Sequence, residues 1–84
     1  MLAFIRQGGD EVAVTCYINV HKPGVREQGS WNGTLDENGV EPFQEGDAVF
    51  VTESRDEARI YISNEYRGTW RRFTGNGPPP GVAP

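Results

Sequence analysis

The chain has 84 residues, 36% of them hydrophobic and 24% charged, with a formal net charge of −4. This length leaves room for a single domain, and no apolar run approaches the ~18 residues that a membrane span needs. The acidic balance argues against a surface that binds polyanions over its whole area, and the single cysteine, Cys16, excludes an internal disulfide framework.

The clearest structural signal is a strict alternation across residues 11–20. One side carries the apolar residues Val12, Val14, Cys16, Ile18 and Val20. A period of two predicts a strand with one face in the core. Residues 1–6 form a short apolar segment, and the glycines within residues 7–10 suit a tight reversal of the chain. Residues 1–6 and 11–20 should therefore form an antiparallel hairpin. Pro23 and Gly24 predict a type II turn after it.

Residues 30–35 return to alternation, with Trp31, Gly33 and Leu35 on one side. Asn38-Gly39 is the strongest short-range hairpin signal in the chain and predicts a return strand over residues 40–43. That strand contains Pro42, which cannot donate to a ladder, so it should be short and lie at a sheet edge. Residues 44–47 should turn again, and residues 48–52 form a further strand.

Residues 54–68 allow two interpretations. Ser54 to Glu57 fits a capping box and Gly68 suits the residue after a helix, so one helix near residues 55–67 is an alternative. Ile60, Tyr61 and Ile62 are consecutive and β-prone, however, and lack the spacing of a helix stripe. We therefore favour a strand, a loop at residues 64–65, and a last strand over residues 66–74.

These elements predict an all-β fold, a small partly open barrel or two-layer sheet of about six short antiparallel strands. Gly33, Gly46 and Gly68 are candidate bend points of such a sheet. The expected domain covers residues 1–74. Residues 75–84 are rich in glycine and proline and should form a flexible tail.

The residues that usually carry catalysis are sparse. The single histidine, His21, and Cys16 fall on opposite strand faces, so local geometry cannot pair them. The paired carboxylates, such as Asp36 with Glu37, lie in predicted turns, where acids usually serve solvation and capping. No segment has the spacing of a metal site or of a phosphate-binding loop, so we expect no cofactor, no metal and no catalytic residues.

Aromatic and cationic residues gather between residues 59 and 73. If residues 64–65 form a two-residue loop, Ile62 faces Arg67 and Arg59 faces Trp70 across the hairpin. Ile60 and Ile62 would then share one face, which Val49 and Val51 could join, and the rings and guanidinium groups would lie on the other. The predicted partner-binding residues are Arg59, Tyr61, Tyr66, Arg67, Trp70 and Arg72.

Trp, Tyr and Arg anchor protein interfaces and also stack on nucleobases. We therefore expect a noncatalytic protein–protein interaction or assembly module, with a protein partner or self-association through this face or through the edge strand near Pro42. A small-barrel protein that binds single-stranded nucleic acid is the alternative, disfavoured by the acidic charge. An accessory protein of a phage or mobile element is a further alternative, by analogy of fold alone. No membrane partner is expected, and without a secretory signal we expect a cytoplasmic location.

Overall fold

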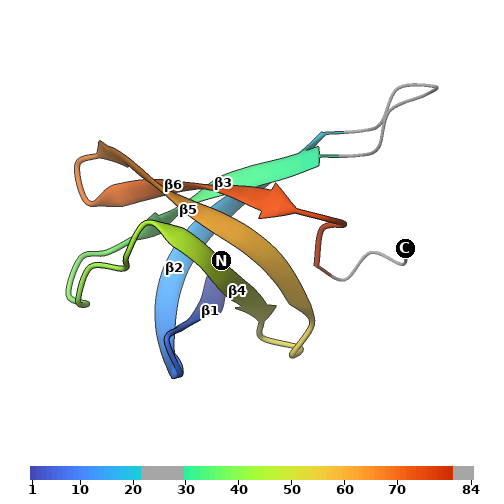
Figure 1. Ribbon diagram of the computed structural model, residues 1–84, viewed down its shortest axis with the longest axis horizontal. Helices are drawn as coiled ribbons and strands as arrows, with labels where there is room; N and C mark the ends of the chain where they lie inside the picture. Colours follow the sequence, from blue (N-terminus) through green and yellow to red (C-terminus); the bar gives the residue numbers. More distant parts are fainter. Residues whose placement is uncertain (22–29, 81–84) are drawn as a thin grey trace.

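A computed structural model of the chain describes residues 1–21 and 30–80 (Figure 1). Its elements are all strands: β1 (Leu2–Gln7), β2 (Asp10–His21), β3 (Ser30–Asp36), β4 (Gly46–Thr52), β5 (Glu57–Arg67) and β6 (Trp70–Asn76). The predicted all-β class with six short strands is confirmed. The alternative helix near residues 55–67 is wrong, because β5 occupies that segment.

The six strands close into an antiparallel barrel in the order β1-β2-β3-β6-β5-β4. The chain builds two three-stranded meanders, β1 to β3 and β4 to β6. Pairing of β3 with β6 joins the meanders on one side, and pairing of β1 with β4 joins them on the other. The second of these ladders closes the barrel, whereas the sequence predicted a partly open barrel or a two-layer sheet.

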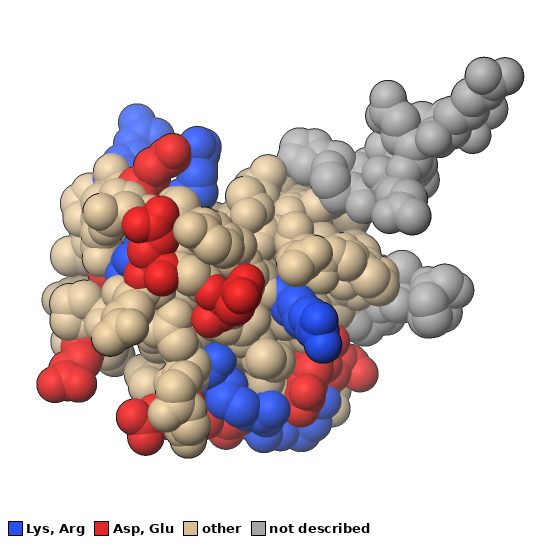
Figure 2. Space-filling model, viewed as in Figure 1, with Lys and Arg blue, Asp and Glu red and all other residues tan. Residues whose placement is uncertain are grey.

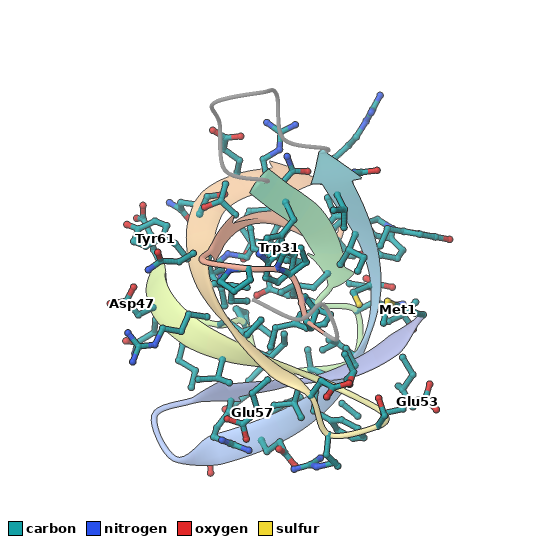
Figure 3. The ribbon with its side chains drawn as sticks, turned by 90° about the vertical axis from the view of Figure 1, so that its right-hand side faces the viewer. Met1, Trp31, Asp47, Glu53, Glu57 and Tyr61 are labelled. Carbon is teal, nitrogen blue, oxygen red and sulfur yellow. The ribbon has the colours of Figure 1, made fainter. Side chains whose placement is uncertain are left out.

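The core follows the alternation that the sequence shows. Val14 and Cys16 of β2 point inward, as do Trp31, Gly33 and Leu35 of β3. The rings of Trp31, Phe50 and Phe73 meet at centroid distances of 5.7 to 5.8 Å. Figure 3 looks into the barrel and shows Trp31 inside the ring of strands, with Tyr61 and Asp47 outside it.

Two glycines allow strands to approach this core closely. A Cβ atom on Gly33 would meet the backbone oxygen of Tyr17 and would lie 2.8 Å from Cζ of Phe73. A Cβ atom on Gly75 would overlap the indole ring of Trp31. Both positions therefore need a residue without a side chain.

The predicted edge strand over residues 40–43 is wrong. These residues belong to the connection between β3 and β4, which are not neighbours in the barrel, so the connection has to cross between them. Phe43 is buried in the core and Val40 packs against it, which explains the apolar residues that resembled a strand. The local Asn38-Gly39 signal is overridden because β3 pairs with β6 instead.

The predicted register of the last hairpin is also wrong. The chain turns at Gly68 and Thr69, where Gly68 has φ 64°, and Arg67 pairs with Trp70. A register irregularity lies between Ile62 and Tyr66, around the expected loop. Ile60 and Ile62 do point inward together, but Ala48 and Phe50 of β4 share the core with them. Val49 lies on the other face of β4.

The last strand continues through Asn76, two residues beyond the domain boundary expected from composition. Just beyond it, the backbone oxygen of Gly77 accepts a hydrogen bond of 3.2 Å from Nε1 of Trp31. The predicted turn at Pro23 and Gly24 lies outside the described residues.

Candidate contact surface

A pair of aromatic rings, one exposed and one half-buried, lies on the outside of the barrel. Tyr17 of β2 and Trp70 of β6 have ring centroids 5.2 Å apart and planes tilted by 35°. Their strands are separated by β3, whose Thr34 pairs with Tyr17 on one side and with Arg72 on the other. Tyr17 is 63% exposed, more than any other large hydrophobic residue of the described chain. The pair therefore presents apolar ring surface to solvent.

Cationic side chains flank the rings. Arg67 pairs with Trp70 across the β5–β6 hairpin, and Arg72 forms an ion pair of 3.2 Å with Glu65. Both side chains of that ion pair are mostly exposed, so water screens the interaction and it is weak. A shallow depression of about 330 Å³ is lined by Thr34, Glu65, Tyr66, Arg67, Trp70 and Arg72. We call Tyr17, Thr34, Arg67, Trp70 and Arg72 the aromatic platform.

The structure brings four of the six predicted partner-binding residues together: Tyr66, Arg67, Trp70 and Arg72. Arg59 and Tyr61 lie elsewhere, because the corrected register pairs Arg59 with Asn76 and Tyr61 with Thr74. Arg59 lines a separate hollow with residues such as Arg6 and Val49.

Tyr66 lies at the rim of the depression but is tied to the barrel. Its hydroxyl donates a hydrogen bond to Glu37, and the guanidinium of Arg71 lies 5.1 Å from its ring centroid. The bond to Glu37 favours the neutral phenol and raises the pKa of Tyr66 above its usual value of 10. The hydroxyl of Tyr66 therefore supports the structure, and only its ring faces outward.

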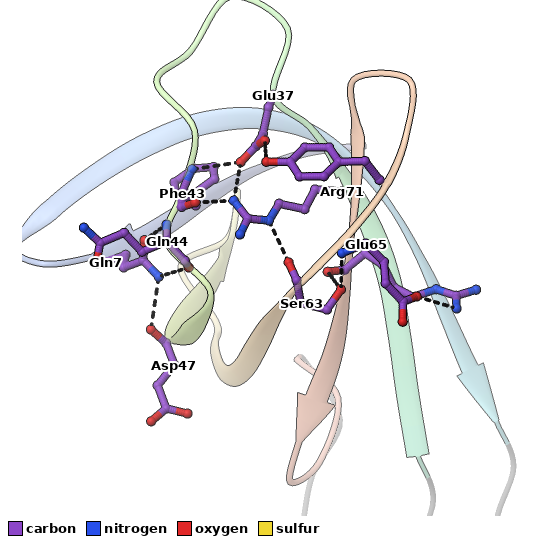
Figure 4. Close-up of polar contacts among 10 residues, drawn as sticks. Gln7, Glu37, Phe43, Gln44, Asp47, Ser63, Glu65 and Arg71 are labelled. Carbon is purple, nitrogen blue, oxygen red and sulfur yellow. Dashed lines mark hydrogen bonds and ion pairs between the residues drawn. The ribbon is translucent and has the colours of Figure 1, made fainter.

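Glu37 and Arg71 form a buried ion pair beneath this rim (Figure 4). They are only 8% and 2% exposed, and Nη1 of Arg71 lies 3.0 Å from Oε2 of Glu37. Arg71 also donates to the backbone oxygens of Ser63 and Phe43, and the Phe43 amide donates to Glu37. The network fastens the β3–β4 connection to β5 and β6. The expectation that Glu37 serves only solvation or capping in a turn is wrong.

The surroundings of Glu37 act on its pKa in opposite directions. Burial by itself would raise the pKa, but the hydrogen bonds from Tyr66, from the Phe43 amide and from Arg71 together outweigh burial. The pKa of Glu37 therefore lies below its usual value of 4.5, and the carboxylate is ionised at neutral pH.

Sequence reasoning missed Tyr17 as a platform residue. Its position in the alternation of residues 11–20 placed it on the outward face, which was the available signal. Its contact with Trp70 depends on the pairing of β3 with β6, which no local pattern predicts. Arg71 also falls within the aromatic and cationic cluster of residues 59–73, but the alternation of β6 points it inward beside Phe73.

Residues 1–21 and 30–80 contain no group of three or more His, Cys, Asp or Glu side chains that could hold a metal ion. Cys16 is a free, buried thiol, and burial raises its pKa. In the same residues, no helix has the length and apolar character required to cross a bilayer.

Acidic and basic side chains are interspersed on the face shown in Figure 2, and neither sign covers it. Comparison with known proteins adds no assignment. The chain matches no protein-family model, and searches of curated proteins and of solved structures find no similar protein.

Proposed function

We propose that this barrel is a noncatalytic interaction module that binds a protein partner on its aromatic platform. The observation that carries the proposal is the contact between the exposed Tyr17 and the half-buried Trp70 on the outer face of the sheet. An aromatic pair contributes about 0.5–1.5 kcal/mol beyond its buried area, and here the Tyr17 ring remains open to solvent. The same rings buried under a partner would supply the aromatic anchors that dominate interface energies.

The charges around the platform favour a protein over a polyanion. Arg72 already forms an ion pair with Glu65, and Asp36 of β3 lies opposite Trp70 in the β3–β6 ladder. Arg67 is the one cation of the platform without an acidic partner among the described residues. A surface that mixes rings, amphipathic cations and carboxylates suits the centre and rim of a protein interface.

The test uses a displayed library of random peptides selected on the whole protein. Binders are then measured against Tyr17→Ala, Trp70→Ala and the matched control Tyr61→Ala. Tyr61 is an exposed ring outside the platform, 44% exposed, and its hydroxyl lies 3.4 Å from Glu45. We expect losses of about 30-fold or more for the platform variants, which corresponds to about 2 kcal/mol, and little change for the control. Binders that tolerate both platform variants would refute the proposal.

Single-stranded nucleic acid is the second candidate, because bases could stack on the Tyr17 and Trp70 rings while Arg67 and Arg72 contact phosphates. A labelled oligothymidine titrated at low salt decides this question by fluorescence anisotropy. Binding that weakens steeply with added salt and disappears in Trp70→Ala would favour nucleic acid over protein. No binding at low salt would remove this candidate and leave the protein proposal intact.

A further inference from the structure

One edge of β2 extends beyond the strand that pairs with it. The first half of β2 pairs with β1 as far as Thr15, which lies opposite Leu2, and the second half pairs with β3. Met1 adds one last pair, because its amino group and carbonyl exchange hydrogen bonds of 2.8 Å with the backbone of Cys16. Beyond Cys16 the strand continues to His21 beside β3, as Figure 1 shows at the upper right of the barrel.

The direction of the backbone groups on this edge follows from the Met1 contact. Cys16 directs its N–H and C=O toward β1, and backbone direction alternates along an antiparallel strand, so Ile18 and Val20 direct theirs to the same side. Within residues 1–21 and 30–80, no strand pairs with that side of Ile18 or Val20. The Val20 side chain is 53% exposed. Such an edge is a ready template for another strand.

We infer that this edge pairs with the same edge of a second copy of the chain. An antiparallel arrangement with its two-fold axis at Asn19 places Ile18 of each copy opposite Val20 of the other. Both are residues whose backbone groups point outward, so each opposed pair exchanges two hydrogen bonds, four in total. The edge is therefore self-complementary, as the interface of a two-fold dimer has to be.

The side chains of the edge fit the same occupant. Natural edge strands often carry charged side chains that block pairing with another strand. Residues 17–20 carry no charged side chain. The arrangement sets Ile18 against Val20 of the other copy on the inner face, where apolar cross-strand pairs are stabilising. An edge this short buries less than the 1,200 to 2,000 Å² of a stable complex, so the dimer should be weak and concentration-dependent.

Pairing in this register makes one continuous sheet from the two copies, with both aromatic platforms on the same side. The inference rests on the β2 edge and not on what the platform binds. Trp70→Ala should leave dimerisation unchanged, so failure of either proposal is visible separately.

Disulfide cross-linking of Asn19→Cys tests the register. Residues opposed without hydrogen bonds lie about 4.5 Å apart at Cα, within the range of a disulfide. The matched control is Thr74→Cys, an exposed strand residue on β6. We expect Asn19→Cys to form covalent dimer at least tenfold faster than the control under mild oxidation of the full chain. The native Cys16 is buried and should not compete. Equal rates for the two variants would overturn the inference.

Sedimentation velocity tests the dimer without a cross-link. The mass of the wild-type chain should rise toward twice the monomer between about 10 µM and 1 mM, the range of a weak complex. Val20→Lys places a charge at the apolar pair and should keep the chain monomeric. Tyr61→Lys makes a comparable change at an exposed site on β5 and should leave the association unchanged. A monomer at every concentration, or equal association in the two lysine variants, would contradict the inference.

Discussion

Replacing Glu37 by Gln removes the counter-charge of Arg71 while keeping the shape of the side chain. The guanidinium of Arg71 is 2% exposed and stays in place through its bonds to Ser63 and Phe43. A buried charge left without its partner typically costs about 3–5 kcal/mol. The substitution also removes one of the two carboxylate oxygens that accept from the Tyr66 hydroxyl and from the Phe43 amide. The single oxygen of Gln can still accept from one of these two donors.

A loss of about 3 kcal/mol is a large fraction of the 5–15 kcal/mol that holds a typical domain folded. For a chain of this size it corresponds to a decrease of roughly 12 °C or more in Tm. Urea unfolding followed by the fluorescence of the buried Trp31 measures the change directly, with thermal unfolding by circular dichroism as the second measurement.

The matched control is Glu65→Gln, which breaks the exposed ion pair with Arg72 and should cost less than about 1 kcal/mol. A double-mutant cycle with Arg71→Met isolates the coupling between Glu37 and Arg71. If Glu37→Gln lies within about 1 kcal/mol of the wild type, and therefore near the control, the network does not hold the β3–β4 connection as described.

The remaining predictions concern the core and acid stability. Gly75→Ala places a methyl group against the Trp31 ring and should lower the free energy of unfolding by about 1–3 kcal/mol, as measured by urea unfolding. An unchanged midpoint of the urea transition would show that β6 moves freely away from the ring. Glu37 has a lowered pKa, so its contribution to stability is present above pH 4.5 and is lost as the pH falls through the pKa of the folded state. The free energy of unfolding should therefore decline more steeply between about pH 6 and pH 2.5 for the wild type than for Glu37→Gln. Parallel curves for the two proteins would contradict the lowered pKa of Glu37.

The parts of the fold that the sequence predicts are those with local periodicity. Residues 11–20 and 30–35 alternate strictly, so their inward and outward faces could be assigned without knowing the neighbouring strands. The β-prone run at Ile60, Tyr61 and Ile62 correctly outweighed the capping signal near Ser54. These features depend on nearest neighbours along one strand.

The register errors arise where local signals compete. Asn64-Glu65 and Gly68-Thr69 are both plausible turns, and choosing the first misplaced every cross-strand pair of the hairpin. The chain uses the second turn, in which Gly68 adopts the positive φ that glycine allows. The long irregular connection after β3 could not be foreseen either, because it follows from the pairing of β3 with a strand much later in the chain.

The candidate site shows the same division. Trp70, Arg67 and Arg72 were found because they are close in sequence, whereas Tyr17 reaches them only across β3. The burial of Arg71 follows from strand alternation once the start of β6 is known. Its partner Glu37 lies in the β3–β4 connection, 34 residues earlier in the chain, so no spacing rule connects them.

The joining of two meanders by β1–β4 and β3–β6 also bears on how the chain folds. Each meander can form from hairpins that are near in sequence, but the ladders that join them bring together residues far apart along the backbone. Closing such long loops costs chain entropy before any contact compensates for it. The slow step should therefore be the docking of two partly formed halves, on the millisecond-to-second scale of proteins dominated by distant strand pairing.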